Sequence, residues 1–434
     1  IGNGITPDHH QSRDVGAGSP PSTPTSHRTE SWEEAVRIVV APDKFKGSVT
    51  AREAAEHMGE GMRQALPDAD VILLPVADGG EGTLDAAVEA GYERHEVTVT
   101  GPVGRAVDAA WARHGTEAVI EMSLASGLAA LPQDAEGEPV RAPLDATSRG
   151  TGELVRAALD AGCTRIILAV GGSATTDGGA GLMAALGARL LDSAGHDLPD
   201  GGGSLSKLDR VDVTGIHPGI AEAEFVLAAD VDNPLTGPRG AATVFAPQKG
   251  ATERDVARLE SGLLRLRDRL SSALGKSARR AADAAGAGAA GGTGYAALAV
   301  LGAIRRPGID VVLDLVSLRE AVETADLVVT GEGSLDEQSL GGKTPLGVLS
   351  VGDAADVPVV VVCGRTTLPW PLLRDTGFRA VYVLSALVDE PHDSMREAPR
   401  LLREVGGSVA REHATDMPWA SDDSPEPDHS TTSL

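Results

Sequence analysis

The chain has 434 residues, of which 41% are hydrophobic and 23% charged, so it is long enough for two or three domains with buried cores. This composition excludes a wholly disordered chain, a collagen and a small disulfide scaffold, and no apolar run approaches the ~18 residues of a membrane helix. Acids outnumber bases by 63 to 38, and the net charge of −25 disfavours nucleic acid and anionic membranes as partners. The two cysteines leave a bridge open, but so few thiols in so long a chain favour a cytoplasmic protein.

Two terminal segments lack the pattern of a folded chain. Residues 1–36 are rich in Gly, Pro, Ser, Thr and His, and residues 412–434 are acidic and rich in Pro and Ser. Neither segment has an apolar period, so both are predicted to be disordered tails. The folded part of the chain is therefore expected to be residues 37–411.

Within 37–411, short apolar runs alternate with longer helical runs. Residues 95–122 alternate apolar and polar side chains, which is typical of antiparallel strands. The other elements predicted, in chain order, are strand 37–41, helix 50–66, strand 71–77, helix 152–161, strand 165–170, helix 178–191, strand 225–229, helix 252–274, helix 293–301, strand 327–330, helix 343–354, strand 357–363 and strand 380–384. Continuous apolar strands between helices favour an α/β fold with parallel strands covered on both faces. The antiparallel stretch indicates that a second domain interrupts the first, and the Ala- and Gly-rich segment 281–292 is predicted to be a crossing and a hinge between them.

Six of the predicted strands run directly into loops that carry Gly or Asp. These loops are 42–48, 78–83, 171–179, 230–235, 331–336 and 363–365. A single loop of this kind is as readily a simple turn, because Gly and Asp are good turn formers. Six together indicate a ligand site, since open α/β sheets bind ligands outside the carboxyl ends of their strands.

The composition of the loops suggests phosphoryl transfer. Loop 171–179, Gly-Gly-Ser-Ala-Thr-Thr-Asp-Gly-Gly, lets backbone N–H groups approach an anion and then opens a helix, whose N-terminus favours phosphate. Carboxylates in the loops are hard oxygen ligands suited to Mg²⁺, and Lys46 and Lys343 can neutralise developing charge. Each acid could instead cap a helix, and Asp177 stands where such a cap is expected.

A second pattern keeps another chemistry open. Residues 286–291, Gly-Ala-Gly-Ala-Ala-Gly, match the dinucleotide-binding pattern, but they follow a helical run and not a strand. An NAD-linked dehydrogenase of small hydroxy acids is therefore an alternative. A non-catalytic sensor of a small acid, with two lobes, is a third hypothesis from a different class.

Eight sequence blocks in order resemble those of the bacterial type I glycerate kinases, from Arg37 to about Arg411. The blocks are 41–48, 78–83, 150–154, 171–179, 230–235, 246–251, 330–336 and 342–345. The resemblance implies ATP-dependent phosphorylation of D-glycerate with Mg²⁺. The product that it favours is 2-phosphoglycerate, with 3-phosphoglycerate as the alternative, and the oligomeric state stays open.

The same resemblance implies a domain organisation. A Rossmann- or flavodoxin-like domain with a parallel sheet would comprise residues 37–78 and 293–411, and an inserted mixed α/β domain would comprise 79–292. The active site is expected in the cleft between them. Two positions depart from the family pattern, since many members have Ser at Lys44 and Arg at Ser334.

The resulting hypothesis assigns a role to each candidate residue. The catalytic residues are expected to be Lys46, Asp78 and Asp177, with Asp78 or Asp177 accepting the substrate proton. Substrate and phosphate are expected to be bound by Asp43, Gly79, Gly80, Gly172, Ser173, Thr175, Gly178, Asn233, Gly331, Gly333 and Lys343. Mg²⁺ is expected at Asp230, Glu332 and Asp336, and the partners are expected to be ATP and D-glycerate alone.

Overall fold

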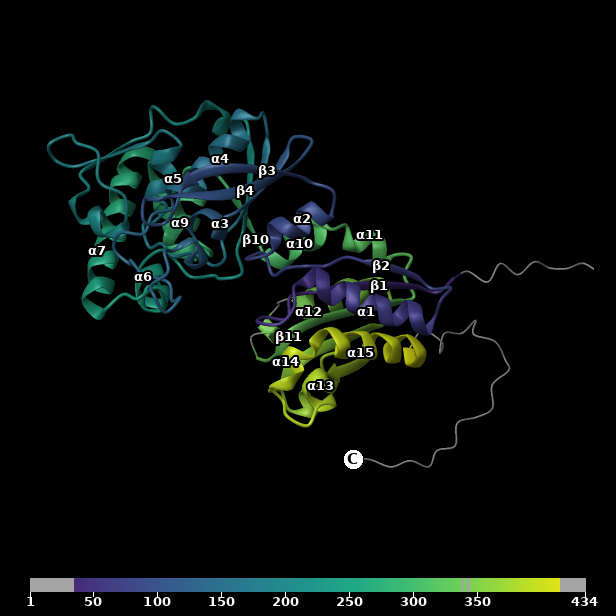
Figure 1. Ribbon diagram of the computed structural model, residues 1–434. Coiled ribbons are helices and arrows are strands. Elements are labelled where there is room, and N and C mark those ends of the chain that lie inside the picture. Colours follow the sequence, from purple (N-terminus) through teal and green to yellow (C-terminus); the bar gives the residue numbers. More distant parts are fainter. Residues whose placement is uncertain (1–34, 338, 342–343, 414–434) are drawn as a thin grey trace, which may run out of the picture. The chain divides into compact units, whose positions relative to one another are not determined.

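The computed structural model describes residues 35–337, 339–341 and 344–413 (Figure 1). The predicted tails therefore lie outside the described residues, apart from 35–36 and from 412–413, which end helix α15 (Ala398–His413). Lys343 also lies outside them. Within the described ranges, every helix is too short or too polar to cross a bilayer.

A five-stranded parallel sheet is formed by the two ends of the folded chain. Its strands, in spatial order, are β2 (Asp70–Leu73), β1 (Arg37–Pro42), β11 (Leu327–Leu335), β12 (Val359–Thr366) and β13 (Ala380–Val383). All neighbouring strands are parallel, which confirms the predicted sheet type. If the five strands are numbered in chain order within this sheet, their spatial order is 2-1-3-4-5, which is that of flavodoxin-like folds. The chain builds the sheet outward in one direction up to β2 and in the other direction from β11, so the switch point lies between β1 and β11.

Alternate side chains of the central strand β1 supply two separate cores. Ile38 packs in a core with α1 (Ala51–Ala65) and α15, whereas Val39 packs in a core with α12 (Thr344–Ala354). Figure 1 shows α1 and α15 lying side by side along the sheet. Because helices cover both faces, successive residues of β1 from Ile38 to Ala41 are all apolar and buried, as the sequence pattern predicted.

Helix α1 begins where the sequence predicts. The Thr50 hydroxyl accepts from the Glu53 backbone N–H at 3.1 Å, and the Glu53 carboxylate accepts from the Thr50 N–H at 2.8 Å. This reciprocal capping box satisfies two N–H groups that the helix itself leaves without partners. The start of the helix predicted over 50–66 is therefore confirmed.

The middle of the chain forms a six-stranded mixed sheet. Its strands, in spatial order, are β3 (Glu93–Thr100), β4 (Ala106–His114), β5 (Glu117–Glu121), β6 (Arg165–Ala169), β9 (Glu224–Ala228) and β10 (Ile304–Arg306). Strand β4 is antiparallel to both of its neighbours, β3 and β5, and the other neighbouring pairs are parallel. The antiparallel stretch predicted at 95–122 is thus confirmed.

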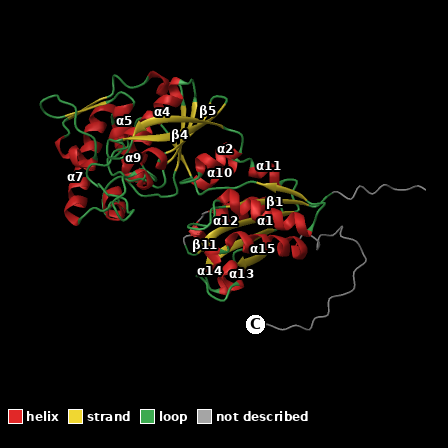
Figure 2. Cartoon of the chain, viewed as in Figure 1, coloured by secondary structure: helices red, strands yellow, loops and turns green. Residues whose placement is uncertain are grey.

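Helices cover this second sheet too (Figure 2). One core contains α4 (Arg149–Asp160), α5 (Ala180–Ala185), α7 (Glu253–Leu274) and α9 (Ala289–Ala299). The opposite faces of the strands pack with α2 (Thr83–Glu89) and α10 (Gly308–Leu315). Val311 of α10 belongs to this core while Val312 belongs to a core of the five-stranded sheet, so α10 is apolar on two sides.

The remaining elements are short. The helices are α3 (Ser123–Ser126), α6 (Ala241–Phe245), α8 (Lys276–Ala282), α11 (Leu318–Val322), α13 (Trp370–Arg374) and α14 (Asp393–Arg396), and β7 (Arg189–Leu191) pairs with β8 (Arg210–Asp212). Turns of 3₁₀ helix lie at 128–130, 202–207, 218–221, 247–249, 339–341 and 384–387.

Several predicted elements end at other residues in the structure. The strand predicted over 71–77 ends at Leu73, and the strand predicted over 357–363 runs on to Thr366. The helix predicted over 178–191 ends at Ala185, because the chain turns at 186–188 and continues as β7. The strand predicted over 327–330 continues to Leu335, because it pairs with β12 as far as Leu335 and Thr366. The loop expected at 331–336 is therefore mostly strand.

The segment 281–292, predicted to cross between domains, packs in the core beside the six-stranded sheet. Ala282, Ala287 and Tyr295 all pack in the core beside the six-stranded sheet, and the chain next joins a core of the five-stranded sheet at Ile309. The proposed domains, 37–78 with 293–411 and 79–292, remain a prediction. Strand β10, which follows residue 293, pairs with β9 in the six-stranded sheet.

The two cysteines are free and buried. Cys163 belongs to the core beside the six-stranded sheet, and Cys363 belongs to a core of the five-stranded sheet. The bridge that the sequence left open is therefore absent.

Helices α1 and α15 approach so closely that their crossing tolerates no side chain. A Cβ at Gly406 would lie 2.2 Å from the carbonyl oxygen of Met58, whereas a Cβ at Gly407 would lie 3.3 Å from its nearest neighbours. We expect Gly406→Ala to lower the free energy of unfolding by about 1–3 kcal/mol, as overpacking does. Urea titration measures this loss, and Gly407→Ala is the matched control. Equal effects of the two substitutions would contradict the packing explanation.

Candidate active site

Each of the six predicted loops reaches one of two cavities. The larger cavity, of about 700 Å³, is lined from the segments after β1 and within or after β11 and β12, including Lys46, Glu332 and Arg365. The smaller cavity, of about 340 Å³, is lined from the segments after β6 and β9, including Ser173 and Asp230. Asp78 lines both cavities.

The larger cavity lies where the order of the parallel sheet reverses. Asp43 and Lys46 follow β1, and Glu332, Gly333 and Asp336 lie in or after β11. Ligands of open α/β sheets bind at this switch point, because the loops on either side of it diverge and leave a crevice. The five-stranded sheet thus places five predicted site residues around one hollow.

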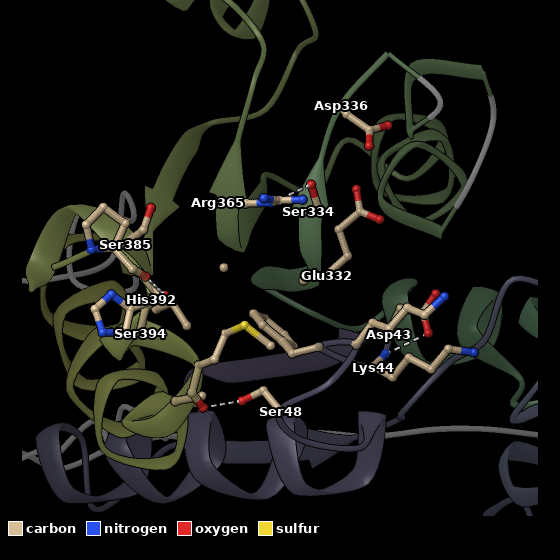
Figure 3. A pocket seen from close by; sticks show the side chains of 18 of the residues that line it. Asp43, Lys44, Ser48, Glu332, Ser334, Asp336, Arg365, Ser385, His392 and Ser394 are labelled. Atoms are coloured by element: carbon tan, nitrogen blue, oxygen red, sulfur yellow. Dashed lines mark hydrogen bonds between the residues drawn. The ribbon is translucent and has the colours of Figure 1, made fainter. Parts of the chain in front are cut away.

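Figure 3 shows this cavity from close by. Arg365 extends from β12 toward Ser334 on β11, and its Nε lies 3.4 Å from the Ser334 hydroxyl oxygen. The same wall carries the carboxylates of Glu332 and Asp336, and His392 lies opposite. The cavity therefore combines cationic and anionic side chains, as a site for a charged small molecule requires.

Asp43 is buried at the edge of the larger cavity. It is 8% exposed, and its carboxylate accepts from the Lys44 N–H at 2.6 Å and from the Thr344 hydroxyl at 3.0 Å. Burial, and then the negative charge of Asp78, raise the pKa of Asp43 to about 6. The Asp78 carboxylate is thus close enough to disfavour the ionisation of Asp43.

The smaller cavity is walled by glycine backbone. Gly79, Gly80 and Gly172 line it, and a Cβ at Gly171 would lie 2.5 Å from the Gly80 Cα. Such bare backbone lets N–H groups approach an anion closely. Asp230 also lines this cavity, and its carboxylate accepts from the backbone N–H that begins α10 at 2.7 Å.

Asp177 anchors two helices inside the protein. It is fully buried and lines neither cavity, and its carboxylate accepts from the Ser148 N–H and hydroxyl at 2.9 and 2.8 Å. It also accepts from the Gly179 and Gly181 N–H groups at 3.0 and 3.1 Å. Burial raises its pKa, and these hydrogen bonds oppose the shift. The geometry thus matches the capping role that the sequence left open, and the role of Asp177 as a proton acceptor stays a prediction.

The other predicted site residues fall into two groups, those that line one of the two cavities and those that line neither. Those that line a cavity are Lys46, Asp78, Asp43, Gly79, Gly80, Gly172, Ser173, Gly333, Asp230, Glu332 and Asp336. Thr175, Gly178, Asn233 and Gly331 line neither cavity. The Gly178 N–H donates to the Gly291 carbonyl, and the Asn233 side-chain amide donates to the Arg239 carbonyl. Both residues therefore stabilise neighbouring backbone segments through hydrogen bonds.

The predicted Mg²⁺ ligands lie in two places. Glu332 and Asp336 line the larger cavity, and Asp230 lines the smaller. Among residues 35–337, 339–341 and 344–413, no three His, Cys, Asp or Glu side chains are arranged to hold a metal ion. Mg²⁺ that arrives with a nucleotide needs only one or two carboxylates, because phosphates and water complete its shell. The donors fit that kind of site and not a cage of three carboxylates.

Sequence reasoning missed two residues that shape the site. Glu121, at the end of β5, is 4% exposed and accepts from the Gly82 and Leu84 N–H groups at 3.1 Å each, so it holds the loop that follows Asp78. Lys249 lines the smaller cavity and donates to the Ser173 hydroxyl at 2.8 Å. In the sequence, Glu121 looks like an ordinary strand residue, and Lys249 lies 76 positions from Ser173. The residues adjacent to each in sequence therefore do not reveal these contacts.

The dinucleotide pattern lacks its structural context. Residues 286–291 follow helix α8 and run into the start of α9, so a helix and not a strand precedes them. A Cβ at Gly291 would lie 2.0 Å from the Thr175 carbonyl oxygen, so this backbone packs against loop 171–179. Its glycines serve packing between two segments of the protein.

We expect Asp43→Asn to change the pH dependence of stability. The folded-state pKa of about 6 lies above the ordinary 3.8, so ionised Asp43 destabilises the native state as the pH rises through 6. Relative to wild type, the variant should gain nothing below about pH 4 and up to about 3 kcal/mol above pH 7. Urea titrations at several pH values measure the difference. A difference that does not vary with pH would contradict this assignment.

Comparisons with known proteins agree on one family. A profile of the glycerate kinase family matches residues 38–414. A glycerate kinase of Bacillus subtilis (strain 168) is 44% identical over 86% of this chain and 97% of its own, and glycerate 2-kinase of Escherichia coli (strain K12) is 42% identical over 84% and 94%. A crystal structure from Salmonella typhimurium LT2, provisionally assigned as glycerate kinase 2, has a TM-score of 0.76 and 41% identity, and covers 87% of this chain and 98% of its own.

Proposed function

The chain belongs to the glycerate kinase family, and we propose that it transfers the γ-phosphoryl group of ATP to a hydroxyl group of D-glycerate. The observation that carries this proposal is the position of Asp78, which lines both cavities. A phosphate chain in one cavity and an acceptor in the other would meet at this carboxylate. Phosphoryl transfer depends mainly on such positioning and on electrostatic stabilisation.

The walls of the two cavities suggest which substrate each takes. Glycine backbone around Gly172 and Ser173 suits the phosphate chain of ATP in the smaller cavity. Lys46 and Arg365 suit the carboxylate of glycerate in the larger cavity. We assign the nucleotide phosphates and the glycerate accordingly.

Asp78 would act as the general base. The glycerate oxygen forms a bond to the γ-phosphorus, the bond from that phosphorus to the bridging oxygen of ADP breaks, and the hydroxyl proton passes to the Asp78 carboxylate. Asp43 lies beside Asp78, and burial together with the charge of Asp78 disfavours the ionisation of Asp43.

Asp230 is the carboxylate best placed to bind Mg²⁺ together with the phosphates, since it lines the smaller cavity. When bound, Mg²⁺ would neutralise charge on the transferred group. Glu332 and Asp336 line the larger cavity, on the acceptor side, and remain proposed secondary ligands.

We propose that the 2-hydroxyl is phosphorylated, in line with the name of the E. coli relative. Phosphorus NMR of the product made from ATP and D-glycerate tests the activity and the regiochemistry together. We expect 2-phosphoglycerate. A product phosphorylated at the 3-hydroxyl would overturn the regiochemistry, and stabilisation by glycerate without ATP consumption would indicate a sensor.

We further propose a cytoplasmic location. Cys163 and Cys363 are both free thiols, which suit a reducing compartment. Fractionation of cells that produce the full chain tests this proposal.

We expect Asp78→Asn to lower kcat by at least ~10²-fold, because it removes the general base. A coupled assay of ADP release with ATP and D-glycerate measures the loss. Asp68→Asn, at an exposed position of the turn before β2, is the matched control and should keep wild-type turnover. Wild-type turnover by Asp78→Asn, with an unchanged melting temperature, would remove Asp78 from this role.

Turnover should also depend on a divalent cation. Excess EDTA is expected to abolish ADP release, and Mg²⁺ added beyond the EDTA should restore it, because the phosphates need a counter-charge. Activity that EDTA leaves unchanged would refute the metal requirement.

A further inference from the structure

Lys249 is a lysine buried in the wall of the smaller cavity. Its side chain lies at the end of the 3₁₀ turn 247–249 and is 2% exposed. The ammonium group donates to the Ser173 hydroxyl at 2.8 Å and to the Thr175 carbonyl. These contacts use two of its three N–H donors and tie it to loop 171–179.

This cation has no counter-ion within the part of the chain that the structure describes. Among the described residues, no carboxylate forms an ion pair with Lys249, and Asp177 acts on it only through space. Burial lowers the pKa of Lys249 to about 7, and the charge of Asp177 opposes that shift. An ammonium without a paired anion is costly to bury, so an arriving anion would stabilise it.

The surroundings of Lys249 match a phosphate group. Loop 171–173 lines the same cavity with glycine backbone, which leaves room for an anion beside the ammonium. Asp78 and Asp230 also line this cavity, and their charge would repel a bare anion. A cation in the wall is therefore needed if phosphates are to bind here.

We propose that Lys249 is the buried cation that binds the phosphate chain of the nucleotide in the smaller cavity, and that it holds loop 171–175 in the shape that receives it. This inference rests on the proposed function, because it takes the nucleotide as the ligand. It assigns the anion to ATP and not to the carboxylate of glycerate.

Lys249→Met tests the proposal, because methionine keeps most of the unbranched side chain and removes the ammonium group. Calorimetric titration with ADP, and with adenosine, which lacks phosphates, separates contact with phosphate from contact with the base. We expect ADP to bind ~10–10²-fold more weakly, as loss of a charged hydrogen bond implies, and adenosine to bind as in wild type. Lys276→Met, at an exposed lysine, is the matched control.

Steady-state kinetics gives a second measurement. In Lys249→Met, kcat/KM for ATP should fall ~10–10²-fold while KM for D-glycerate stays within about threefold of wild type. Unchanged ADP affinity would overturn the proposal, and so would a rise confined to the KM of D-glycerate. A purely structural lysine would instead lower the melting temperature and weaken ADP and adenosine alike.

Wild-type protein provides a test that needs no variant, should Lys249→Met fail to fold. ADP titrations at about pH 8, in buffers of different ionisation enthalpy, report protons taken up on binding. We expect net uptake, since an adjacent phosphate raises the pKa of Lys249, and zero uptake would contradict the proposal.

The two proposals can fail separately. If wild type binds ADP through Lys249 but makes no phosphoglycerate in the NMR assay, the proposed function fails and the anion site stands. If wild type makes phosphoglycerate and Lys249→Met binds ADP normally, only the role of Lys249 fails.

Discussion

The candidate site depends on the close approach of bare backbone around Asp78. A Cβ at Gly79 would lie 2.2 Å from the Gly308 Cα, and one at Gly171 would lie 2.5 Å from the Gly80 Cα. No side chain fits at these contacts, so glycine is required for steric reasons on both sides of the loop. Glu121 then holds the next turn through two backbone N–H groups. This packing puts the Asp78 carboxylate at the wall of both cavities, where a phosphoryl group would pass between substrates.

Charge inside the site is arranged against the overall charge of the protein. The chain carries a net charge of −25, yet both cavities contain cations, with Lys46 and Arg365 at the larger and Lys249 at the smaller. Burial disfavours charge on Asp43 and on Lys249, and it shifts their pKa values in opposite directions. The charged form of each group is thus energetically unfavourable when no ligand is bound. Binding of a metal and phosphates would relieve that cost, which is how a site can favour its charged substrates over water.

Loops 42–48, 78–83, 171–179 and 230–235 could be predicted from the sequence because each follows an apolar strand, whereas 331–336 and 363–365 are mostly strand themselves. Parallel strands present their carboxyl ends at one edge of a sheet, so Asp43, Asp78 and Asp230 could be expected to face a ligand before any coordinate was known. The same reasoning could not separate Asp177 from them, because a carboxylate at the start of a helix has the same local pattern whether it caps backbone or meets a substrate. Only its four hydrogen bonds and full burial distinguish it.

By itself, the sequence determined the α/β class, the antiparallel stretch, the capped start of α1 and the family, since these follow from local periodicity, capping and ordered motifs. Tertiary structure decided that β11 runs on to Leu335, that segment 281–292 stays in one core, and that the six loops divide between two cavities. It also decided the partners of Lys249 and Glu121. The physical reason is that long-range pairing and burial set these features, and neither depends on the residues adjacent in sequence.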